Sequence, residues 1–499
     1  MPQMLVRFGL ALTVVLLLAA APLAGQEVAQ HPRVRQAITL LQIWLDAQRD
    51  FEQIPGLSVA VVHDQAVVWT GAFGFADLEK KTPATGETIY SICSISKLFT
   101  SIAVMQQRDA GRLRLDDPVS KHLPWFQIRR TDPDGPEITI EGLLTHSAGL
   151  PREAAFPYWT APDFTFPERD AIIEKLKTQE TYFTAQSHHQ YSNLGLTLAG
   201  EIAAAAAGQP YEDYVRARVL APLGLKDTTP EMPKGGRLAT AYSAIQRDGR
   251  RTVVTPFLSR GISPAAGFAS TADDLARFAS WHFRVLDRKG GTDVLATNTL
   301  REMQRVHWMD PDFGTPWGLG YAVWRDKEKT FVGHGGSCPG FRAQLTMNTA
   351  EKVAVIVLAN AQGVDTRALA QRAYDVIGPV IRTAAKAQAA KSEAAKTDVA
   401  PEKPGEQKPD PSLDRYTGTY TTGFAGEVAF VPWEDGLASF GLPSNDPMAG
   451  LGKWKKEGEH TFRRVRRDET LAETLRFEMG PDGRAARVLW HDNTYRRVK

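Results

Sequence analysis

The sequence predicts an α+β domain followed by a separate small β-domain. Strand-like runs occur at 57–69 and again at 331–358, and the stretch between them is mixed and largely helical. Strands at both ends of one region indicate a sheet assembled from distant parts of the chain. After residue 413 the sequence changes to short strand-like runs separated by turn signals, which predicts an antiparallel β-barrel or meander.

The size and charge of the chain agree with this division. A chain of 499 residues with 43% hydrophobic residues can bury a sizeable core, and its length indicates two or more domains. The net charge of +2 gives no reason to expect nucleic acid or an anionic membrane surface as a partner.

Residues 1–25 are predicted to be a secretory signal peptide. An apolar run over 8–24 ends in the small residues Ala24 and Gly25, which indicates processing near Gln26 and a periplasmic or secreted protein. The alternative is an N-terminal membrane anchor, because the run approaches the length that spans a bilayer. After cleavage we expect no stable membrane span, since no other stretch is sufficiently apolar.

A helix and a hairpin open the first predicted domain. Apolar residues between 34 and 51 recur near helical spacing, so an amphipathic helix is predicted there. The runs 57–62 and 66–69 flank a short turn and predict a β-hairpin. A second helix is predicted to begin at Ser94 and to stop at Gly111.

Three strands and a helix close this domain, which we place at 26–381. Residues 331–332, 341–347 and 353–358 are strand-like, and 366–380 has the pattern of a terminal helix.

Residues 382–412 are predicted to be a linker, and the β-domain follows at 413–499. Val399 is the only large apolar residue of the linker. The first half of this segment could extend the preceding helix, whereas its Pro-rich second half could not. We therefore expect limited proteolysis to separate the two domains.

Ser94 and Lys97 form a Ser-x-x-Lys pattern at the start of a predicted helix. Residues three apart share a helix face, so the hydroxyl and the amine can meet. The helix N-terminus also leaves backbone N–H groups free to stabilise negative charge. The pair is therefore a candidate nucleophile with its activator, and two further motifs follow, Tyr191-Ser192-Asn193 and His334-Gly335-Gly336.

These three motifs, in this order, resemble those of the serine β-lactamase and penicillin-binding-protein superfamily. The likeness is closer to the class C-like branch, which includes D-aminopeptidases, D,D-peptidases and esterases. It implies an antiparallel sheet flanked by helices with a helical subdomain, and the β-domain resembles the lipocalin-like domains of some members. The resemblance covers roughly residues 35–380 and includes the segments 54–77, 143–151, 265–278, 316–324 and 333–360.

The resemblance implies a serine hydrolase in which Ser94 is the nucleophile and forms an acyl-enzyme. A hydroxyl needs a base to take its proton, and the candidate bases are Lys97 and Tyr191. A buried Lys97 would have a lowered pKa and could accept the proton itself. Alternatively, Lys97 could hold Tyr191 as a phenolate that does so. The sequence leaves both alternatives open, because a coupled pair can titrate as a unit.

The resemblance also implies the residues that bind substrate. Asn193 would offer its amide to a substrate carbonyl or to the catalytic lysine. His334, Gly336 and Ser337 would contact the substrate from one strand. The backbone N–H groups of Ser94 and Ser337 would form the oxyanion hole.

His334 occupies a position at which the antibiotic-resistance enzymes of the superfamily usually have a lysine. The charge of that lysine attracts the β-lactam carboxylate, whereas a histidine is mostly neutral near pH 7. This difference favours peptide- or ester-like substrates over penicillins. If the charge of His334 affects substrate binding, we expect its ionisation in the pH–activity profile, close to neutral pH.

We therefore predict a serine hydrolase that cleaves small peptides or amides, with D-amino-acid-containing substrates among the candidates. A carboxylesterase of the same fold is the close alternative. A non-catalytic penicillin-binding-like receptor is a second class, although a receptor needs no nucleophile. No cofactor or metal is expected, because His188 and His189 are adjacent and no His-Glu-x-x-His occurs. No oligomeric state is predicted.

Cys93 and Cys338 are predicted to form a disulfide. Some class A serine β-lactamases carry a disulfide at the matching two positions, and both cysteines lie beside motifs that converge on one site in the superfamily. Export would supply the oxidising compartment. The alternative is two buried free thiols.

The C-terminal β-domain contributes none of these motifs. The motifs are complete before residue 380, so the chemistry itself does not require the β-domain. We expect this domain to cover the mouth of the active site or to mediate assembly.

Overall fold

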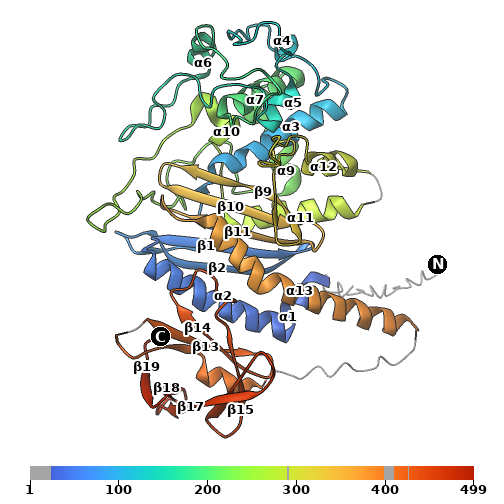
Figure 1. Cartoon of the computed structure of the whole chain (residues 1–499). Coiled ribbons are helices and arrows are strands. Elements are labelled where there is room, and N and C mark those ends of the chain that lie inside the picture. Colours follow the sequence, from blue (N-terminus) through green and yellow to red (C-terminus); the bar gives the residue numbers. More distant parts are fainter. Residues whose placement is uncertain (1–23, 289–290, 398–409, 425) are drawn as a thin grey trace, which may run out of the picture.

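A seven-stranded antiparallel sheet forms the centre of the first domain (Figure 1). The computed structural model describes residues 24–288, 291–397, 410–424 and 426–499. The strands follow the order β3-β2-β1-β11-β10-β9-β8. Their bounds are β1 Gly56–His63, β2 Ala66–Asp77, β3 Thr82–Pro83, β8 Ala322–Asp326, β9 Lys329–Cys338, β10 Phe341–Asn348 and β11 Val353–Ala359.

The two ends of the domain's sequence meet in the middle of this sheet. β1 pairs antiparallel with β11, so that Val59 lies opposite Val357. Both strands are rich in valine, which suits a pleated surface buried on both sides. The predicted hairpin and the predicted assembly of the sheet from distant segments are therefore confirmed.

Three helices cover one face of the sheet: α1 Ala24–Gln30, α2 Pro32–Phe51 and α13 Thr366–Thr397. Alternate residues of β1, namely Leu57, Val59 and Val61, pack into one core with α2 and α13. The predicted helix over 366–380 exists, and it continues as far as Thr397.

The other face of the sheet carries α3 (Ser96–Asp109) and α11 (Ala272–Asp287), and a helical subdomain lies beyond α3 (Figure 1). Ala60 and Val62 of β1 share a second core with Leu98 and Phe99 of α3. The smaller elements are α4 Val119–His122, α5 Ile140–Thr145, α6 Arg169–Leu176, α7 Asn193–Ala207, α8 Tyr211–Val215, α9 Ala221–Leu223, α10 Ser263–Ala266, α12 Thr297–Gln304, and the short strand pairs β4 Tyr90–Ser91 with β5 Ala269–Ser270 and β6 Thr292–Asp293 with β7 Leu295–Ala296.

The C-terminal residues form a closed antiparallel barrel, β12–β19, which follows a 3-10 turn at Pro411–Tyr416. Aromatic side chains fill its interior, among them Phe430, Trp454 and Phe477. The predicted α+β fold followed by an antiparallel barrel is therefore confirmed. The strands are β12 Gly418–Thr421, β13 Glu427–Trp433, β14 Gly436–Leu442, β15 Gly452–Lys456, β16 Thr461–Val465, β17 Leu471–Met479, β18 Ala485–Trp490 and β19 Asn493–Arg497.

The barrel docks on α2, which lies between the barrel and the sheet (Figure 1). Val431 and Phe440 of the barrel share a core with the buried residues of α2. The indole of Trp44 donates a hydrogen bond to the Ser444 carbonyl at 2.8 Å. The barrel is therefore joined to the sheet domain by a continuous apolar core, on the face opposite α3.

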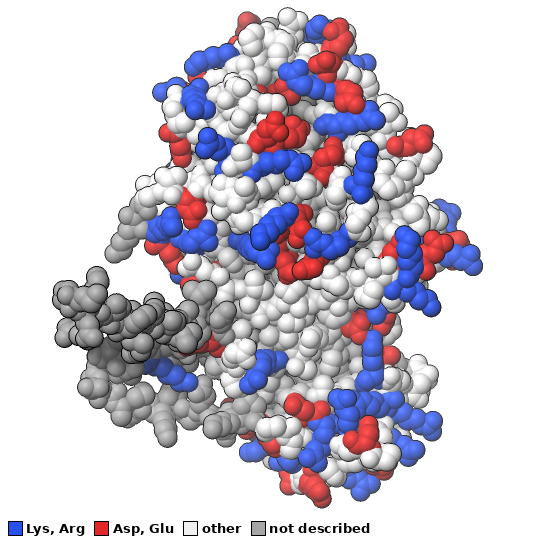
Figure 2. All heavy atoms as spheres, turned by 180° about the vertical axis from the view of Figure 1, so that it is seen from behind, with Lys and Arg blue, Asp and Glu red and all other residues white. Residues whose placement is uncertain are grey.

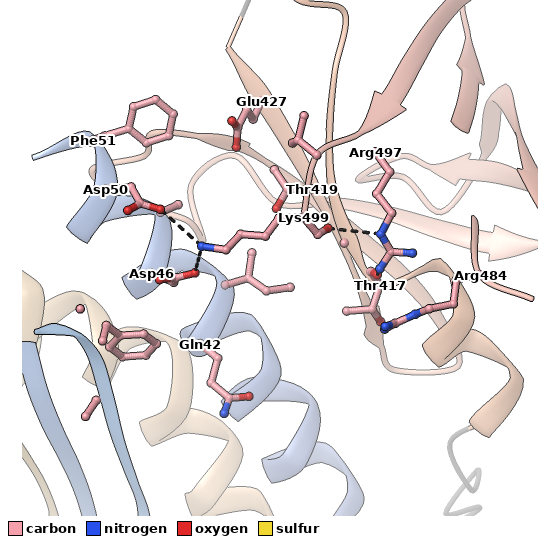
Figure 3. A pocket seen from close by; sticks show the side chains of 17 residues that line it. Gln42, Asp46, Asp50, Phe51, Thr417, Thr419, Glu427, Arg484, Arg497 and Lys499 are labelled. Carbon is pink, nitrogen blue, oxygen red and sulfur yellow. Dashed lines mark hydrogen bonds and ion pairs between the residues drawn. The ribbon is translucent and has the colours of Figure 1, made fainter. Parts of the chain in front are cut away.

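The last residue of the chain adds a polar contact to this junction (Figure 3). Lys499 Nζ bonds to the carboxylate of Asp46 and lies 3.4 Å from that of Asp50, both on α2. A hollow of about 780 Å³ lies beside this contact, between α2, β2 and the barrel. The charged residues around it come from both domains, so it is part of the junction between them.

Two predictions fall largely outside the described residues. The predicted signal peptide covers 1–25, of which 1–23 are not described and Ala24 and Gly25 begin α1. Residues 398–409 of the Pro-rich half of the linker are likewise not described. In the ranges that are described, no helix has the length and apolar character needed to cross a membrane. Positively and negatively charged side chains are interspersed over the rear face of the molecule (Figure 2), in keeping with the small net charge.

Candidate active site

Ser94 lies in a tight turn at the edge of the sheet. The turn is a 3-10 helix, Cys93–Ile95, that leads directly into α3. Cys93 has a φ of 50°, a left-handed conformation that is uncommon for a non-glycine residue. The hydroxyl of Ser96 bonds the Cys93 carbonyl and accepts a hydrogen bond from Phe268 N at 3.0 Å, which fixes the turn against the following helices. The predicted helix therefore begins two residues later than expected, at Ser96, with Ser94 presented just before it.

Lys97 is completely buried one turn along from Ser94. Its Nζ lies 3.2 Å from Ser94 Oγ. The same nitrogen donates to Asn193 Oδ1 at 2.6 Å and to the carbonyl of Ala265 at 2.8 Å. Three separate elements, α3, α7 and α10, thus converge on one amine.

The surroundings of Lys97 favour its neutral form. Burial lowers the pKa of the Lys97 amine well below its ordinary value, and the positive charge of Arg152 acts in the same direction. The carboxylate of Glu153 opposes this shift. Lys97 is therefore suited to accept a proton at neutral pH.

Tyr191 lies just before α7 and lines the cleft in front of Ser94. Its ring centroid is 4.9 Å from Lys97 Nζ and 4.3 Å from the ring of His146. Burial raises the pKa of the Tyr191 phenol, although a hydrogen bond with Ser94 acts against that shift. Burial therefore favours the neutral form of the Tyr191 phenol, which can donate a proton.

Asn193 is the first residue of α7, and its side chain points into the site. Ser192, the residue before it, caps the helix by accepting a hydrogen bond from Gly195 N at 2.9 Å. This leaves the Asn193 amide free to link two groups: its Oδ1 accepts from Lys97, and its Nδ2 donates to Glu153 Oε1 at 2.5 Å.

His334 lies on β9 and is buried and neutral. Its Nδ1 lies 2.6 Å from the Gly335 carbonyl, so Nδ1 carries the proton and Nε2 is left as an acceptor. Burial lowers the pKa of His334 to about 3, and the nearby charge of Lys97 adds to the shift. The expected ionisation of His334 near neutral pH is therefore wrong, because burial disfavours the protonated, charged imidazole.

Gly336 brings β9 against the turn that carries Ser94. A β-carbon at this position would lie 2.3 Å from the Ile92 carbonyl oxygen, so only glycine permits the approach. The next residue, Ser337, lines the same cleft as Ser94. Cys338 follows on β9 and is joined to Cys93 by a disulfide with the Cα atoms 5.7 Å apart.

The cleft in front of Ser94 has a volume of about 630 Å³ and a positive lining. Arg152, Arg342 and Arg367 contribute guanidinium groups to it, and no Asp or Glu of the described chain lines it. Arg342 lies on β10 directly opposite Ser337, and Arg367 lies in the first turn of α13. The positive residues of this cleft therefore come from the segment before α6, from β10 and from α13, and not from the His334 motif on β9.

A family model described as Beta-lactamase matches residues 44–377. The chain belongs to the beta-lactamase family. The matched range contains every motif residue described above, from Cys93 to Cys338, and ends within α13. The barrel lies outside the matched range.

Two curated members of this family are similar to the chain over part of their length. Beta-lactamase-like protein 2 of Dictyostelium discoideum is 26% identical over 309 residues, 61% of this chain and 55% of that protein. Protein flp of Staphylococcus aureus (strain MW2) is 26% identical over 313 residues, 62% of this chain and 60% of that protein. The chain therefore matches less than two thirds of each of these relatives.

Three solved structures share the beta-lactamase fold. A penicillin-binding protein homologue from Pyrococcus abyssi superposes with a TM-score of 0.58 at 21% identity, covering 92% of this chain and 99% of that one. A D-stereospecific amidohydrolase from Streptomyces gives 0.56 at 23%, covering 68% and 98%. A D-amino acid amidase from Ochrobactrum anthropi SV3 also gives 0.56, at 24%, covering 71% and 99%.

The structure adds site residues that sequence reasoning missed. Glu153, the Ala265 carbonyl, Arg342 and Arg367 reach the site only through tertiary packing. Glu153 lies two positions after the family-like segment 143–151, and this proximity is the signal that the sequence offers for it. His146, within that segment, has a structural contact: its Nδ1 accepts a hydrogen bond from the Ser192 backbone at 3.1 Å.

The described residues hold no group of three or more His, Cys, Asp or Glu side chains that could bind a metal ion.

Proposed function

We propose that the protein is a serine hydrolase of the class C-like branch that forms an acyl-enzyme on Ser94. The arrangement of the Lys97 amine is the observation that carries this proposal. A neutral amine has two N–H donors and one lone pair. Asn193 Oδ1 and the Ala265 carbonyl can only accept, so they take both donors, and the lone pair is left to face Ser94 Oγ at 3.2 Å. Lys97 is therefore the base, in preference to Tyr191.

The remaining groups fit the later steps of acyl transfer. As Ser94 Oγ attacks the substrate carbonyl, Lys97 accepts the hydroxyl proton. The backbone N–H groups of Ser94 and Ser337 stabilise the oxyanion, a contribution worth roughly 3–4 kcal/mol for one such donor in other enzymes. Tyr191, neutral and lining the cleft, passes its proton to the leaving group and regains a proton from Lys97. A water molecule then attacks the ester, with one of its protons returning to Ser94 Oγ as the acid leaves, and the free enzyme is restored.

We propose small peptides or amides as the substrates, with a carboxylate on the leaving group. Tyr191 lines the same cleft as Arg342 and Arg367, so a leaving group that it protonates lies beside two guanidinium groups. Two structural neighbours are a D-stereospecific amidohydrolase and a D-amino acid amidase, which supports an amide bond as the target and makes D-residues the first stereochemistry to test.

We also propose that the protein works outside the cytoplasm. The Cys93–Cys338 disulfide supports this location, because such bonds persist in oxidising compartments. The apolar run at the N-terminus supports export as well.

A fluorophosphonate label, followed by a substrate panel, tests the proposal. The label should attach to Ser94 in the wild-type protein and in Ser412→Ala, a control at a half-buried serine in the turn before the barrel, but not in Ser94→Ala. The panel pairs acetyl-D-Ala-D-Ala with its L,L isomer and with its C-terminal amide, and adds a p-nitrophenyl ester and nitrocefin. Hydrolysis by Ser94→Ala at the wild-type rate would refute the mechanism, and faster cleavage of the neutral amide would refute the carboxylate preference.

A further inference from the structure

Glu153 is a nearly buried carboxylate close to Lys97 that the mechanism above does not use. Its side chain is 14% exposed. Oε1 accepts hydrogen bonds from Asn193 Nδ2 at 2.5 Å and from the Trp159 indole at 2.9 Å. Oε2 is buried and has no hydrogen-bond partner among the described residues. Burial raises the pKa of the Glu153 carboxyl, and the hydrogen bonds from Asn193 and Trp159 oppose that shift, as do the charges of Arg152 and Lys97. A carboxylate left partly unsatisfied at such a position is costly to keep, which indicates a role beyond packing.

The position of Glu153 is fixed by the backbone as well as by its side chain. The N–H groups of Asn193 and Leu194, at the start of α7, donate to the Arg152 carbonyl at 2.8 and 3.1 Å. This ties the segment carrying Glu153 to the same helix end that carries Asn193. The carboxylate therefore cannot move away from the amide independently of α7.

Asn193 is held from both ends by this arrangement. Its Nδ2 must face a carboxylate, and its Oδ1 must face the Lys97 amine. An amide turned the other way would place Nδ2 against a second donor and Oδ1 against a second acceptor, losing both bonds. Glu153 thus determines the orientation of the Asn193 amide. In this orientation Asn193 Oδ1 accepts one N–H of the Lys97 amine.

We propose that Glu153 is a positioning residue that orients Asn193 toward Lys97, and whose negative charge sets the pH at which Lys97 becomes the base. This inference rests on the proposed function, because it assigns Glu153 a role in activating Ser94. The negative charge favours the protonated amine, so its removal should extend activity to lower pH.

The other charged and titratable groups around Lys97 do not replace this effect. Arg152 is positive and disfavours the protonated amine. Tyr191 is neutral because burial raises its pKa, and burial keeps His146 and His334 neutral by lowering theirs. Glu153 is the one carboxylate identified as favouring the protonated form of Lys97 among the described residues.

Two substitutions separate the effect of the charge of Glu153 from the effect of its side-chain length. Glu153→Gln keeps the length and an acceptor for Asn193 but removes the charge. Glu153→Asp keeps the charge but shortens the side chain, so that the carboxylate no longer reaches the Asn193 amide. Glu180→Gln is the matched control, because the Glu180 carboxylate is partly exposed and pairs with Arg129 on the surface, at 2.6 Å.

The test measures kcat/KM for a neutral p-nitrophenyl ester, and the rate of fluorophosphonate labelling of Ser94, from pH 5 to pH 10. In Glu153→Gln the acidic limb of both profiles should move down by about one pH unit, with the plateau within about threefold of wild type. In Glu153→Asp the limb should stay in place while the plateau falls about tenfold. Glu180→Gln should match wild type.

An unmoved limb in Glu153→Gln, or an unchanged plateau in Glu153→Asp, would overturn the inference. If the glutamine variant fails to fold, the aspartate variant decides, and a limb that moves in it counts against the role of the charge. Failure of the proposed function is distinguishable, because the wild-type protein would then show no labelling of Ser94 at any pH.

Discussion

Replacing Gly336 by alanine tests how closely β9 must approach the nucleophile. The added β-carbon would lie 2.3 Å from the Ile92 carbonyl oxygen and 3.2 Å from Ala343 Cβ on the neighbouring strand. Ile92 cannot yield easily, because its N–H bonds the Phe268 carbonyl at 2.9 Å and its carbonyl accepts from Ile95. An ordinary contact requires the strand and the turn to separate by about 1 Å.

That displacement would act on catalysis more than on stability. It moves the backbone N–H of Ser337 relative to Ser94, and a misplacement of about 1 Å costs on the order of 100-fold in rate. The overpacking itself should cost about 1–3 kcal/mol of unfolding free energy.

The assay is the rate of fluorophosphonate labelling of Ser94, together with kcat/KM on the best substrate and a thermal melt. Gly441→Ala is the control, since a β-carbon there meets no atom within 4 Å. We expect a loss of about 100-fold in labelling for Gly336→Ala and none for the control. Labelling at the wild-type rate in Gly336→Ala would refute the argument that this approach forms the oxyanion site.

Three further predictions concern the disulfide, His334 and the barrel. Replacing Cys93 and Cys338 by serine opens a link between residues 245 positions apart, worth up to about 5 kcal/mol in the chain-entropy model, so an unchanged melting temperature would contradict a stabilising role. Because the pKa of His334 is lowered to about 3, its neutral form contributes stability that is present above about pH 6.5 and is lost as pH falls toward 3. Urea unfolding of His334→Gln should therefore lose less free energy across that window than the wild-type protein, and equal losses would count against this. Finally, the separation of the two domains by proteolysis that the sequence predicts is no longer expected, because the barrel shares a core with α2. Protein cut by protease in the predicted linker should still elute as one species in gel filtration, and two separate peaks would show that this core does not hold the domains together.

The sequence predicts the sheet well but places the ends of the helices less well. The last strand of 331–358, β11, pairs with β1 as expected, because both are continuous apolar runs of the kind that is buried on both faces of a sheet. The helix expected over 366–380 runs to Thr397 with Pro379 inside it. Pro379 lacks one N–H, but the alanine-rich stretch after it favours helix strongly enough to continue.

The site residues that belong to one short motif are predicted from the sequence, whereas those brought to the site by tertiary packing are missed. Ser94 and Lys97 meet because they lie three positions apart on adjoining turns. Glu153 reaches the site because its carboxylate bonds to Asn193 at the start of α7, and Arg342 reaches it because β10 pairs with β9. No local sequence pattern reveals either contact. The expected position of the β-domain over the active-site mouth is likewise wrong, because apolar side chains on the outer side of α2 provide the docking surface instead. Its predicted role in assembly stays a prediction.

The position of α2 has a consequence for how the two domains can change over evolution. The helix is buried on one side by the sheet and on the other by the barrel, so its apolar residues belong to one core with both. Loss of the barrel would expose the outer side of α2, and a different C-terminal domain would need a matching surface there. The barrel and α2 are therefore constrained to change together, although about 400 positions separate them.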